Sequence, residues 1–260
     1  MDVTSRAHPV VKQCRRLLRD GKERESSRLF VTEGVRLCAD ALASGVGIAC
    51  VLYTPQAQSR YPEVDALRAA AAQQICLTPE LAAYIGDTVS PQGVFCLCKM
   101  LDKKTTFDTI RYKGKYIALE RIQDPGNLGG IFRTAEALGA DGAILIGECC
   151  DRYNPKVLRS SMGGVFRLPV FETDDPAQTM ALLRPHGMRF YACVADDGAT
   201  AVQTVRFGPG SVCLIGNEGN GLRAETVQAC DASVTIPMNG RAESLNAGTA
   251  AAIILWEMFR

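Results

Sequence analysis

The chain has 260 residues, of which 47% are hydrophobic and 22% charged, and its net charge at pH 7 is +1. This length is enough for a sizeable core in one large or two small domains. No run approaches the roughly 18 apolar residues that a membrane span needs, and the polar N-terminus lacks the apolar core of a signal peptide. We therefore expect a cytoplasmic protein.

The cysteine and histidine content argues against a metal site. The eleven cysteines are odd in number and show no C-x-x-C spacing, so we expect reduced side chains that pack as small apolar residues. The two histidines, His8 and His186, each adjoin a proline in an expected loop. This makes histidine-ligated metals and histidine acid–base catalysis improbable, and we predict no metal.

The first hundred residues read as one small α/β unit. Apolar periodicity predicts helices at 10–19, 34–45, 62–72 and 79–85, and strands at 29–31, 48–53, 74–77 and 93–100. The charged stretch that follows lacks periodicity, so we expect a linker at 104–114 between a domain at 1–103 and a second domain at 115–260.

The N-terminal thirty residues are basic, with eight Lys or Arg against four Asp or Glu. Lys12, Arg15, Arg16 and Arg19 lie close together on the first expected helix. Such a group is either a solvated helix face or a surface that contacts phosphates.

The second half alternates strands and helices. We expect strands at 116–120, 143–146, 169–171, 190–194, 212–215 and 234–236, and helices at 128–139, 155–166 and 176–183, with an Ala-rich helix at the C-terminus. Six strands interleaved with helices predict an α/β fold with a mostly parallel sheet.

Two glycine-rich loops suggest a ligand site. Each follows an expected strand, as GNEGNGL at 216–222 and IPMNGRAESLN at 236–246, and such loops present backbone groups to ligands at the carboxyl edge of a sheet. Ser244 could be no more than the N-cap of the last helix. Capping does not require Asn246 two residues later, nor Glu218, which we expect to be buried in the first loop.

A third segment, DPGNLGGIFR at 124–133, also stands between a strand and a helix. Asn127 could be a helix N-cap. Arg133 lies in an apolar stretch of the N-terminal half of the helix, where the dipole disfavours a cation, so we expect an anionic partner such as a phosphate. The glycines match neither the dinucleotide nor the P-loop pattern, and no G-x-S-x-G motif is present.

Together these motifs resemble the SpoU-type, or TrmH-like, branch of the SPOUT RNA methyltransferases. The resemblance rests on DPGNLGGIFRTAEALGADG, LIGNEGNGL and IPMNGRAESLN, supported by KVLRSSMGGVFRLPV. FVTEGVRLCADAL, near the N-terminus, is similar to the start of the ribosomal-protein-like RNA-binding domain that many members carry.

The resemblance implies transfer of a methyl group from S-adenosylmethionine to a ribose 2′-hydroxyl of RNA. It also implies a C-terminal deep trefoil knot and a homodimer formed through the knotted domain. By this resemblance Ala195, Gly216, Ile236 and Leu245 bind the cofactor, while Asn127, Arg133, Glu218, Ser244 and Asn246 surround the reacting ribose. Ala247-Gly248 departs from the Val-Ser pair frequent in the family.

In this family the arginine at the position of Arg133 has been cast as the base, but an arginine side chain stays protonated in proteins. We therefore expect Arg133 to hold the phosphate and the hydroxyl in line with the methyl group, and Glu218 to be structural. The extra N-terminal domain favours ribosomal RNA as substrate. Two alternatives remain, a transfer-RNA ribose methylase and a catalytically silent RNA-binding or resistance factor of the same fold.

Overall fold

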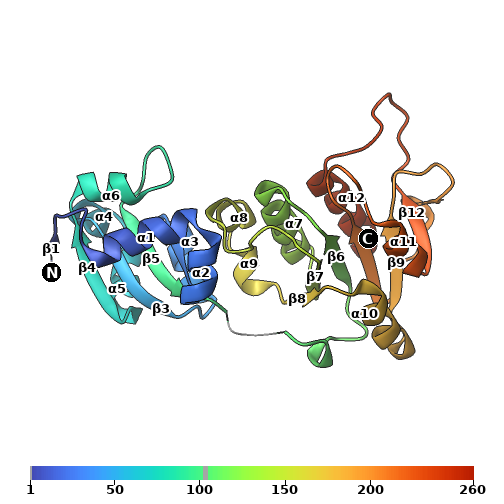
Figure 1. The fold of residues 1–260 in the computed structure, drawn as a ribbon, viewed down its shortest axis with the longest axis horizontal. Coiled ribbons are helices and arrows are strands. Elements are labelled where there is room, and N and C mark those ends of the chain that lie inside the picture. The colour runs from blue at the N-terminus through green and yellow to red at the C-terminus, as the bar shows by residue number, and fades with distance from the viewer. Residues whose placement is uncertain (1, 102–104) are drawn as a thin grey trace. The chain divides into compact units, whose positions relative to one another are not determined.

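The computed structural model describes residues 2–101 and 105–260, which divide into two compact units (Figure 1). The first holds the described residues up to 101 together with Tyr153–Phe166, and the second holds the rest. The predicted boundary at 103–104 lies outside the described residues. Within the described ranges, no helix has the length and apolar character needed to cross a membrane.

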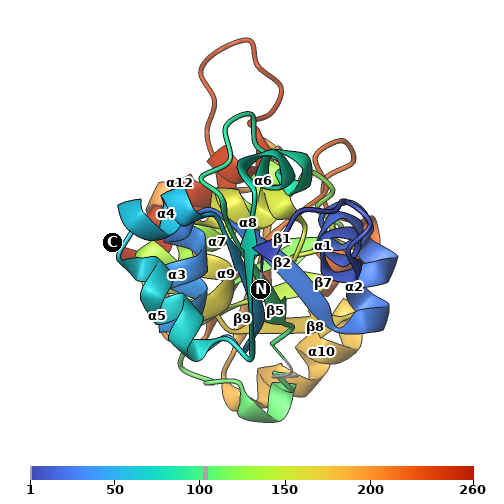
Figure 2. The same cartoon turned by 90° about the vertical axis from the view of Figure 1, so that its left-hand side faces the viewer.

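The first unit is built on a mixed five-stranded sheet with the order β1-β4-β3-β5-β2. β5 runs antiparallel to β2 and β3, whereas β4 runs parallel to β3. Its strands are β1 Asp2–Val3, β2 Leu29–Glu33, β3 Ile48–Tyr53, β4 Gln73–Leu77 and β5 Val94–Lys99, and its helices before residue 101 are α1 Pro9–Arg19, α2 Gly21–Ser27, α3 Val35–Ala43, α4 Pro55–Arg60, α5 Glu63–Ala70 and α6 Pro79–Ile85. In Figure 2, α4 and α6 both lie in the upper part of the first unit.

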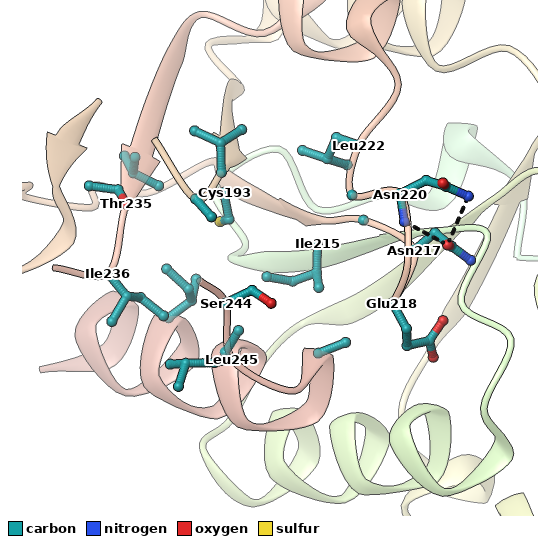
Figure 3. A pocket seen from close by; sticks show the side chains of 18 of the residues that line it. Cys193, Ile215, Asn217, Glu218, Asn220, Leu222, Thr235, Ile236, Ser244 and Leu245 are labelled. Atoms are coloured by element: carbon teal, nitrogen blue, oxygen red, sulfur yellow. Dashed lines mark hydrogen bonds between the residues drawn. The ribbon is translucent and has the colours of Figure 1, made fainter. Parts of the chain in front are cut away.

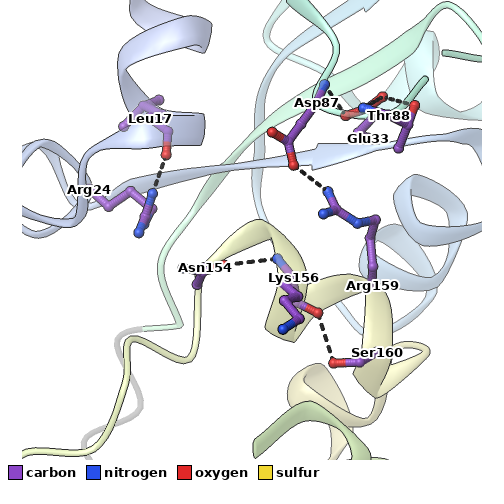
Figure 4. Close-up of polar contacts among 9 residues, drawn as sticks. All are labelled: Leu17, Arg24, Glu33, Asp87, Thr88, Asn154, Lys156, Arg159 and Ser160. Carbon is purple, nitrogen blue, oxygen red and sulfur yellow. Dashed lines mark hydrogen bonds and ion pairs between the residues drawn. The ribbon is translucent and has the colours of Figure 1, made fainter. Parts of the chain in front are cut away.

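Residues 153–166 pack with this first unit. The ring of Phe30 stacks on Tyr153, with centroids 4.6 Å apart, and on Phe166 at 5.9 Å. Arg159 forms a 2.9 Å ion pair with Asp87 (Figure 4). The segment forms α8 Pro155–Ser161 and α9 Gly164–Arg167, not the single predicted helix, because Met162 takes a left-handed conformation with φ of 48°.

The second unit contains a seven-stranded sheet, and every described pair in it is parallel. The order is β10-β12-β9-β11-β6-β7-β8. The strands are β6 Tyr116–Glu120, β7 Gly142–Ile146, β8 Val170–Thr173, β9 Arg189–Cys193, β10 Thr200–Ala201, β11 Ser211–Ile215 and β12 Ala232–Thr235. The predicted α/β fold with a mostly parallel sheet is confirmed. The two-residue edge strand β10 was not predicted, since it has no apolar run.

Helices cover both faces of this sheet, which is why its central strands read as continuous apolar runs. The helices are α7 Pro125–Ala137, α10 Pro176–Leu183, α11 Ala224–Ala229 and α12 Ala247–Phe259, with short 3-10 helices at Phe107–Thr109, Arg184–His186 and Val202–Thr204. Val212 and Leu214 pack in a cluster with Met180 and Leu183 of α10. α12 packs against α7 and β11.

The segment at 105–114, predicted as a linker, has packed side chains. Ile110 is buried, and the ring of Phe107 stacks on Phe171 with centroids 5.5 Å apart. The Thr105 hydroxyl donates a 2.5 Å hydrogen bond to the carbonyl oxygen of Val170. Phe107 and Ile110 lie three positions apart, on one face of a short turn. Their packing attaches this polar segment to the second unit.

Candidate active site

A cavity of about 410 Å³ lies at the carboxyl edge of the parallel sheet, where β9, β11 and β12 end (Figure 3). This is the edge at which open α/β sheets bind ligands. Its lining is mostly apolar and backbone, with few polar side chains. The lining residues are Cys193, Val194, Ala195, Ile215, Gly216, Asn217, Glu218, Gly219, Asn220, Gly221, Leu222, Val234, Thr235, Ile236, Met238, Ser244, Leu245, Ala247, Ala250 and Ile254.

The structure brings all four predicted cofactor residues to this cavity. Ala195 follows β9, Gly216 follows β11, and Ile236 follows β12, while Leu245 precedes α12. Glu218 and Ser244 also line it. Sequence reasoning missed Leu222 and Met238, although both lie within the quoted motifs. The local sequence does not show which apolar side chain of a loop points into a cavity.

The loop after β11 folds back closely on Gly216. A Cβ atom at Gly216 would lie 2.1 Å from the backbone carbon of Gly221 and 2.1 Å from the backbone nitrogen of Leu222. Asn217 closes the turn, because its Oδ1 accepts hydrogen bonds from the backbone N–H groups of Gly219 (3.0 Å) and Asn220 (3.1 Å). Only glycine fits at position 216 without moving the loop.

The Glu218 carboxylate joins this loop to the segment that follows β6. It accepts hydrogen bonds from the backbone N–H groups of Gln123 (3.1 Å) and Asp124 (3.0 Å), and from the Asn127 side chain (3.0 Å). Partial burial raises the pKa of Glu218, but these hydrogen bonds outweigh it and hold the pKa below its usual value. The residue is exposed, not buried as predicted, and its carboxylate is ionised and committed to structural bonds at neutral pH.

Asn127 connects Glu218 to the last helix. Its Oδ1 accepts a 2.9 Å hydrogen bond from Asn246 Nδ2, while its Nδ2 donates to Glu218. We call these three residues, Glu218, Asn127 and Asn246, the amide–carboxylate chain. It unites loops that follow β6, β11 and β12.

Neither Asn127 nor Ser244, the two residues that could have been helix N-caps, has that role. Asp124, not Asn127, caps α7 by accepting from the Asn127 backbone N–H at 2.9 Å. Asn246, not Ser244, caps α12 by accepting from Gly248 (2.9 Å) and Thr249 (3.2 Å). The side chains of Asn127 and Ser244 are therefore available for other contacts, and Ser244 lines the cavity.

Arg133 lies apart from this group. It is exposed on α7, does not line the cavity, and makes no hydrogen bond or ion pair with the residues that the structure describes. It lies six positions after Asn127, which at about 100° per residue places the two side chains on different sides of the helix. Its neighbours Ile131, Phe132 and Ala135 are buried, while Arg133 itself lies on the exposed face of the helix. The anionic partner expected for Arg133 stays a prediction.

The predicted basic residues share one face of α1, at the helical spacing of three and four residues. Lys12, Arg16 and Arg19 are exposed. Arg15 is half-buried, and its guanidinium carbon lies 3.8 Å from the centroid of the Tyr84 ring. Their predicted role in RNA binding stays a prediction.

Among the described residues, no group of three or more His, Cys, Asp or Glu side chains could hold a metal ion. Cys150 is a poor nucleophile, because the thiolate is the reactive form. Burial raises the pKa of Cys150 to about 12.

The fold and the cavity define an α/β protein with a ligand site at the carboxyl edge of a parallel sheet. The SpoU rRNA Methylase family matches residues 114–256, and the MRM3-like substrate binding domain matches residues 8–96. The chain belongs to the SpoU rRNA methylase family.

Relatives with known activities extend over nearly the whole chain. The 23S rRNA (uridine(2479)-2′-O)-methyltransferase of Streptomyces viridochromogenes is 33% identical over 263 residues, covering 99% of this chain and 91% of the relative. The 23S rRNA (guanosine(2553)-2′-O)-methyltransferase RlmP of Bacillus subtilis is 30% identical over 237 residues, covering 91% of each. The crystal structure of an AdoMet-bound rRNA methyltransferase from Sinorhizobium meliloti aligns with a TM-score of 0.87 at 32% identity, over 99% of this chain and 97% of that one.

Proposed function

We propose that this protein transfers a methyl group from S-adenosylmethionine to a ribose 2′-hydroxyl of ribosomal RNA. The observation that carries the proposal is the cavity of about 410 Å³ beside the amide–carboxylate chain, within a fold shared with an AdoMet-bound relative. Its volume lies in the range of about 300–1,000 Å³ typical of small-molecule sites.

The cavity fits S-adenosylmethionine chemically. Ile215, Ile236 and Leu245 supply apolar surface for the nucleoside, and the loop after β11 supplies backbone groups. Glu218 is the one charged side chain among the described lining residues, and its lowered pKa keeps it negative, which suits a cationic sulfonium. In this proposal Ala195, Gly216, Ile236 and Leu245 hold the cofactor, which supplies the methyl group.

The remaining site residues position the ribose. Arg133 binds a phosphate of the RNA and orients the attacking hydroxyl, since orientation alone contributes several kcal/mol. The amide–carboxylate chain holds the three loops in fixed positions relative to one another. Ser244 lies at the cavity wall, where it can reach the ribose. No residue in this set takes the proton as a strong base, so the hydroxyl proton passes to solvent or to an RNA phosphate.

Ribosomal RNA is favoured over transfer RNA by the length of the matches. The two 23S rRNA methyltransferases cover more than nine-tenths of this chain. A structure concerned with 2′-OH methylation of C/U34 on tRNA covers 56% of it, with a TM-score of 0.50. The first unit is thus shared with ribosomal RNA enzymes, although a transfer RNA substrate and a silent RNA-binding factor stay as alternatives.

We further propose the division into an RNA-binding domain at 1–103, a connecting segment at 104–114 and a catalytic domain at 115–260. The deep trefoil knot and the homodimer belong to the same proposal. Support for the homodimer comes from α12, where Ala251 and Ile254 are buried while Trp256 is 60% exposed, leaving a large apolar side chain for a partner subunit. The cytoplasmic location is supported by the ribosomal RNA substrates in the names of the relatives.

The test is a paired measurement on the purified chain. Calorimetry with S-adenosylmethionine should give a saturable affinity, and tritiated S-adenosylmethionine should label a 23S ribosomal RNA transcript at ribose 2′-oxygens. Cofactor binding with no transfer to any ribosomal or transfer RNA would favour the silent factor, and labelling of transfer RNA alone would favour the second alternative.

A further inference from the structure

The first unit contains its own cavity of about 440 Å³, at the carboxyl ends of β3 and β4. It lies wholly within residues 8–96, which match the MRM3-like substrate binding domain. The lining comes from α4, α6 and the segment before β5: Thr54, Gln56, Ala57, Arg60, Tyr61, Pro79, Ala82, Ala83, Pro91, Gln92 and Gly93.

Hydrogen bonds and close contacts within the chain hold the walls of this cavity in place. The backbone N–H of Thr54 donates a 2.9 Å hydrogen bond to the carbonyl of Gly93. Gly93 has a φ of +74°, and a Cβ there would lie 2.6 Å from Thr54 Oγ1, so this close approach requires glycine. The buried Glu33 carboxylate accepts from the backbone N–H groups of Asp87 (2.9 Å) and Thr88 (3.3 Å), which secures the loop leading to Pro91 (Figure 4). A pre-formed cavity binds with little ordering cost.

One side of the cavity offers an aromatic ring and a guanidinium. Tyr61 is half-buried, and the guanidinium carbon of Arg60 lies 5.3 Å from the centroid of its ring. No carboxylate is among the described residues that line the cavity. This combination favours a flat ring placed beside an anionic group.

Next to Tyr61, the cavity offers an oriented amide. Gln92 Oε1 accepts a 2.9 Å hydrogen bond from the backbone N–H of Val35, and Gln92 Nε2 lies 3.4 Å from the Tyr61 hydroxyl. A side-chain amide has two N–H donors, and no described residue takes the second one. The amide is therefore held in a fixed plane with a donor available to a ligand.

We propose that this cavity binds one unpaired base of the RNA, stacked on Tyr61 and hydrogen-bonded to Gln92, with the adjoining phosphate at Arg60. Proteins read single-stranded RNA by such stacking on aromatic and arginine side chains combined with contacts to base edges. The inference rests on the proposed function only for the identity of the ligand as RNA. Tyr84 of α6 does not line the cavity, and the guanidinium carbons of Arg6 and Arg15 lie 4.5 and 3.8 Å from the centroid of its ring.

The experiment measures binding of the full chain to a fluorescein-labelled single-stranded RNA dodecamer by anisotropy. Tyr61→Ala should weaken binding about tenfold, in line with the loss of one stacked base, and Arg60→Ala should weaken it by a similar factor through the loss of a phosphate contact. Tyr61→Phe keeps the ring and should bind within about threefold of the unmodified chain. Arg68→Ala is the matched control, because Arg68 also lies over a tyrosine, 5.0 Å from the Tyr53 centroid, but lines neither cavity.

A second probe tests whether the contact made by Tyr61 is to a base of the RNA. A ribose-phosphate dodecamer without bases should bind the unmodified chain and Tyr61→Ala equally, since the deleted contact is to a base. The proposal is overturned if the chain does not bind the base-bearing RNA, if Tyr61→Ala binds it normally, or if Tyr61→Ala weakens both probes alike. Absence of methyl transfer by a chain that shows the Tyr61 effect would contradict the proposed enzyme activity while leaving this cavity as a base site.

Discussion

The side-chain amide of Asn246 donates a 2.9 Å hydrogen bond to the side-chain oxygen of Asn127, 119 residues earlier in the chain. The bond sets which way the Asn127 amide faces: its oxygen points to Asn246 and its nitrogen to the Glu218 carboxylate. An aspartate at position 127 would place a second negative charge against Glu218. The positions of three loops around the cavity thus depend on two amides.

Asn246→Asp should separate helix capping from this link. Aspartate caps a helix as well as asparagine, so the melting temperature should change little. The new carboxylate cannot donate to Asn127, and we expect methyl transfer to fall at least tenfold. Asn246→Ala should lose the cap as well, at about 1 kcal/mol of unfolding free energy. Thermal melts and tritium transfer measure both effects, and normal transfer by Asn246→Asp would contradict a role for the link.

Glu218 should make stability depend on pH. Its pKa in the folded chain lies below the ordinary value of 4.5, so its contribution is present above the unfolded pKa and is lost as the pH falls through the folded one. Glu218→Gln should be less stable than the unmodified chain at pH 7, and the difference should shrink as the pH falls below about 4.5. Urea unfolding at several pH values tests this, and a difference independent of pH would show that charge is not the cause.

Gly216→Ala should abolish S-adenosylmethionine binding. The added Cβ would meet backbone atoms 2.1 Å away, which cannot move without opening the loop after β11. Gly208→Ala is the control, because Gly208 does not line the cavity and no atom lies within 4 Å of the added Cβ. Calorimetry on both variants, with circular dichroism to establish folding, should find cofactor affinity lost in the first and kept in the second.

Arg133→Ala should reduce methyl transfer by about 100-fold or more and leave S-adenosylmethionine affinity within about twofold, since the side chain does not line the cavity. Arg133→Lys should also fail, because an ammonium does not reproduce the planar guanidinium. The exposed Arg206 provides a control substitution to Ala. Wild-type transfer by Arg133→Ala would remove Arg133 from the proposed mechanism.

The basic face of α1 should bind RNA through charge. Replacing the exposed Lys12 and Arg16 with Gln should weaken RNA binding. It should also reduce the magnitude of the slope of log affinity against log salt concentration by about two. The same exchange at Arg36 and Lys99, which are exposed elsewhere in the first unit, should leave that slope unchanged. Equal slopes in both double variants would identify the α1 residues as an ordinary solvated face.

Apolar runs in the sequence predicted most strands and helices. Strand 116–120 and the helices at 79–85 and 176–183 begin and end where predicted, because periodicity and prolines at helix starts are local properties. The same local reasoning brought the glycine loops to the carboxyl edge of the sheet, since parallel strands all end there. The family resemblance, not local pattern, supplied the four cofactor residues that line the cavity at that edge, Ala195, Gly216, Ile236 and Leu245.

Tertiary contacts decided the rest. Asp124 and Asn246 cap the helices in place of Asn127 and Ser244, because a cap depends on which of several nearby polar side chains is free to turn back on the helix. The partners of Glu218 lie more than ninety residues away in the chain. These hydrogen bonds between distant residues form because β11 lies beside β6 in the sheet. The order of strands is set by the folded sheet and cannot be predicted from local sequence patterns.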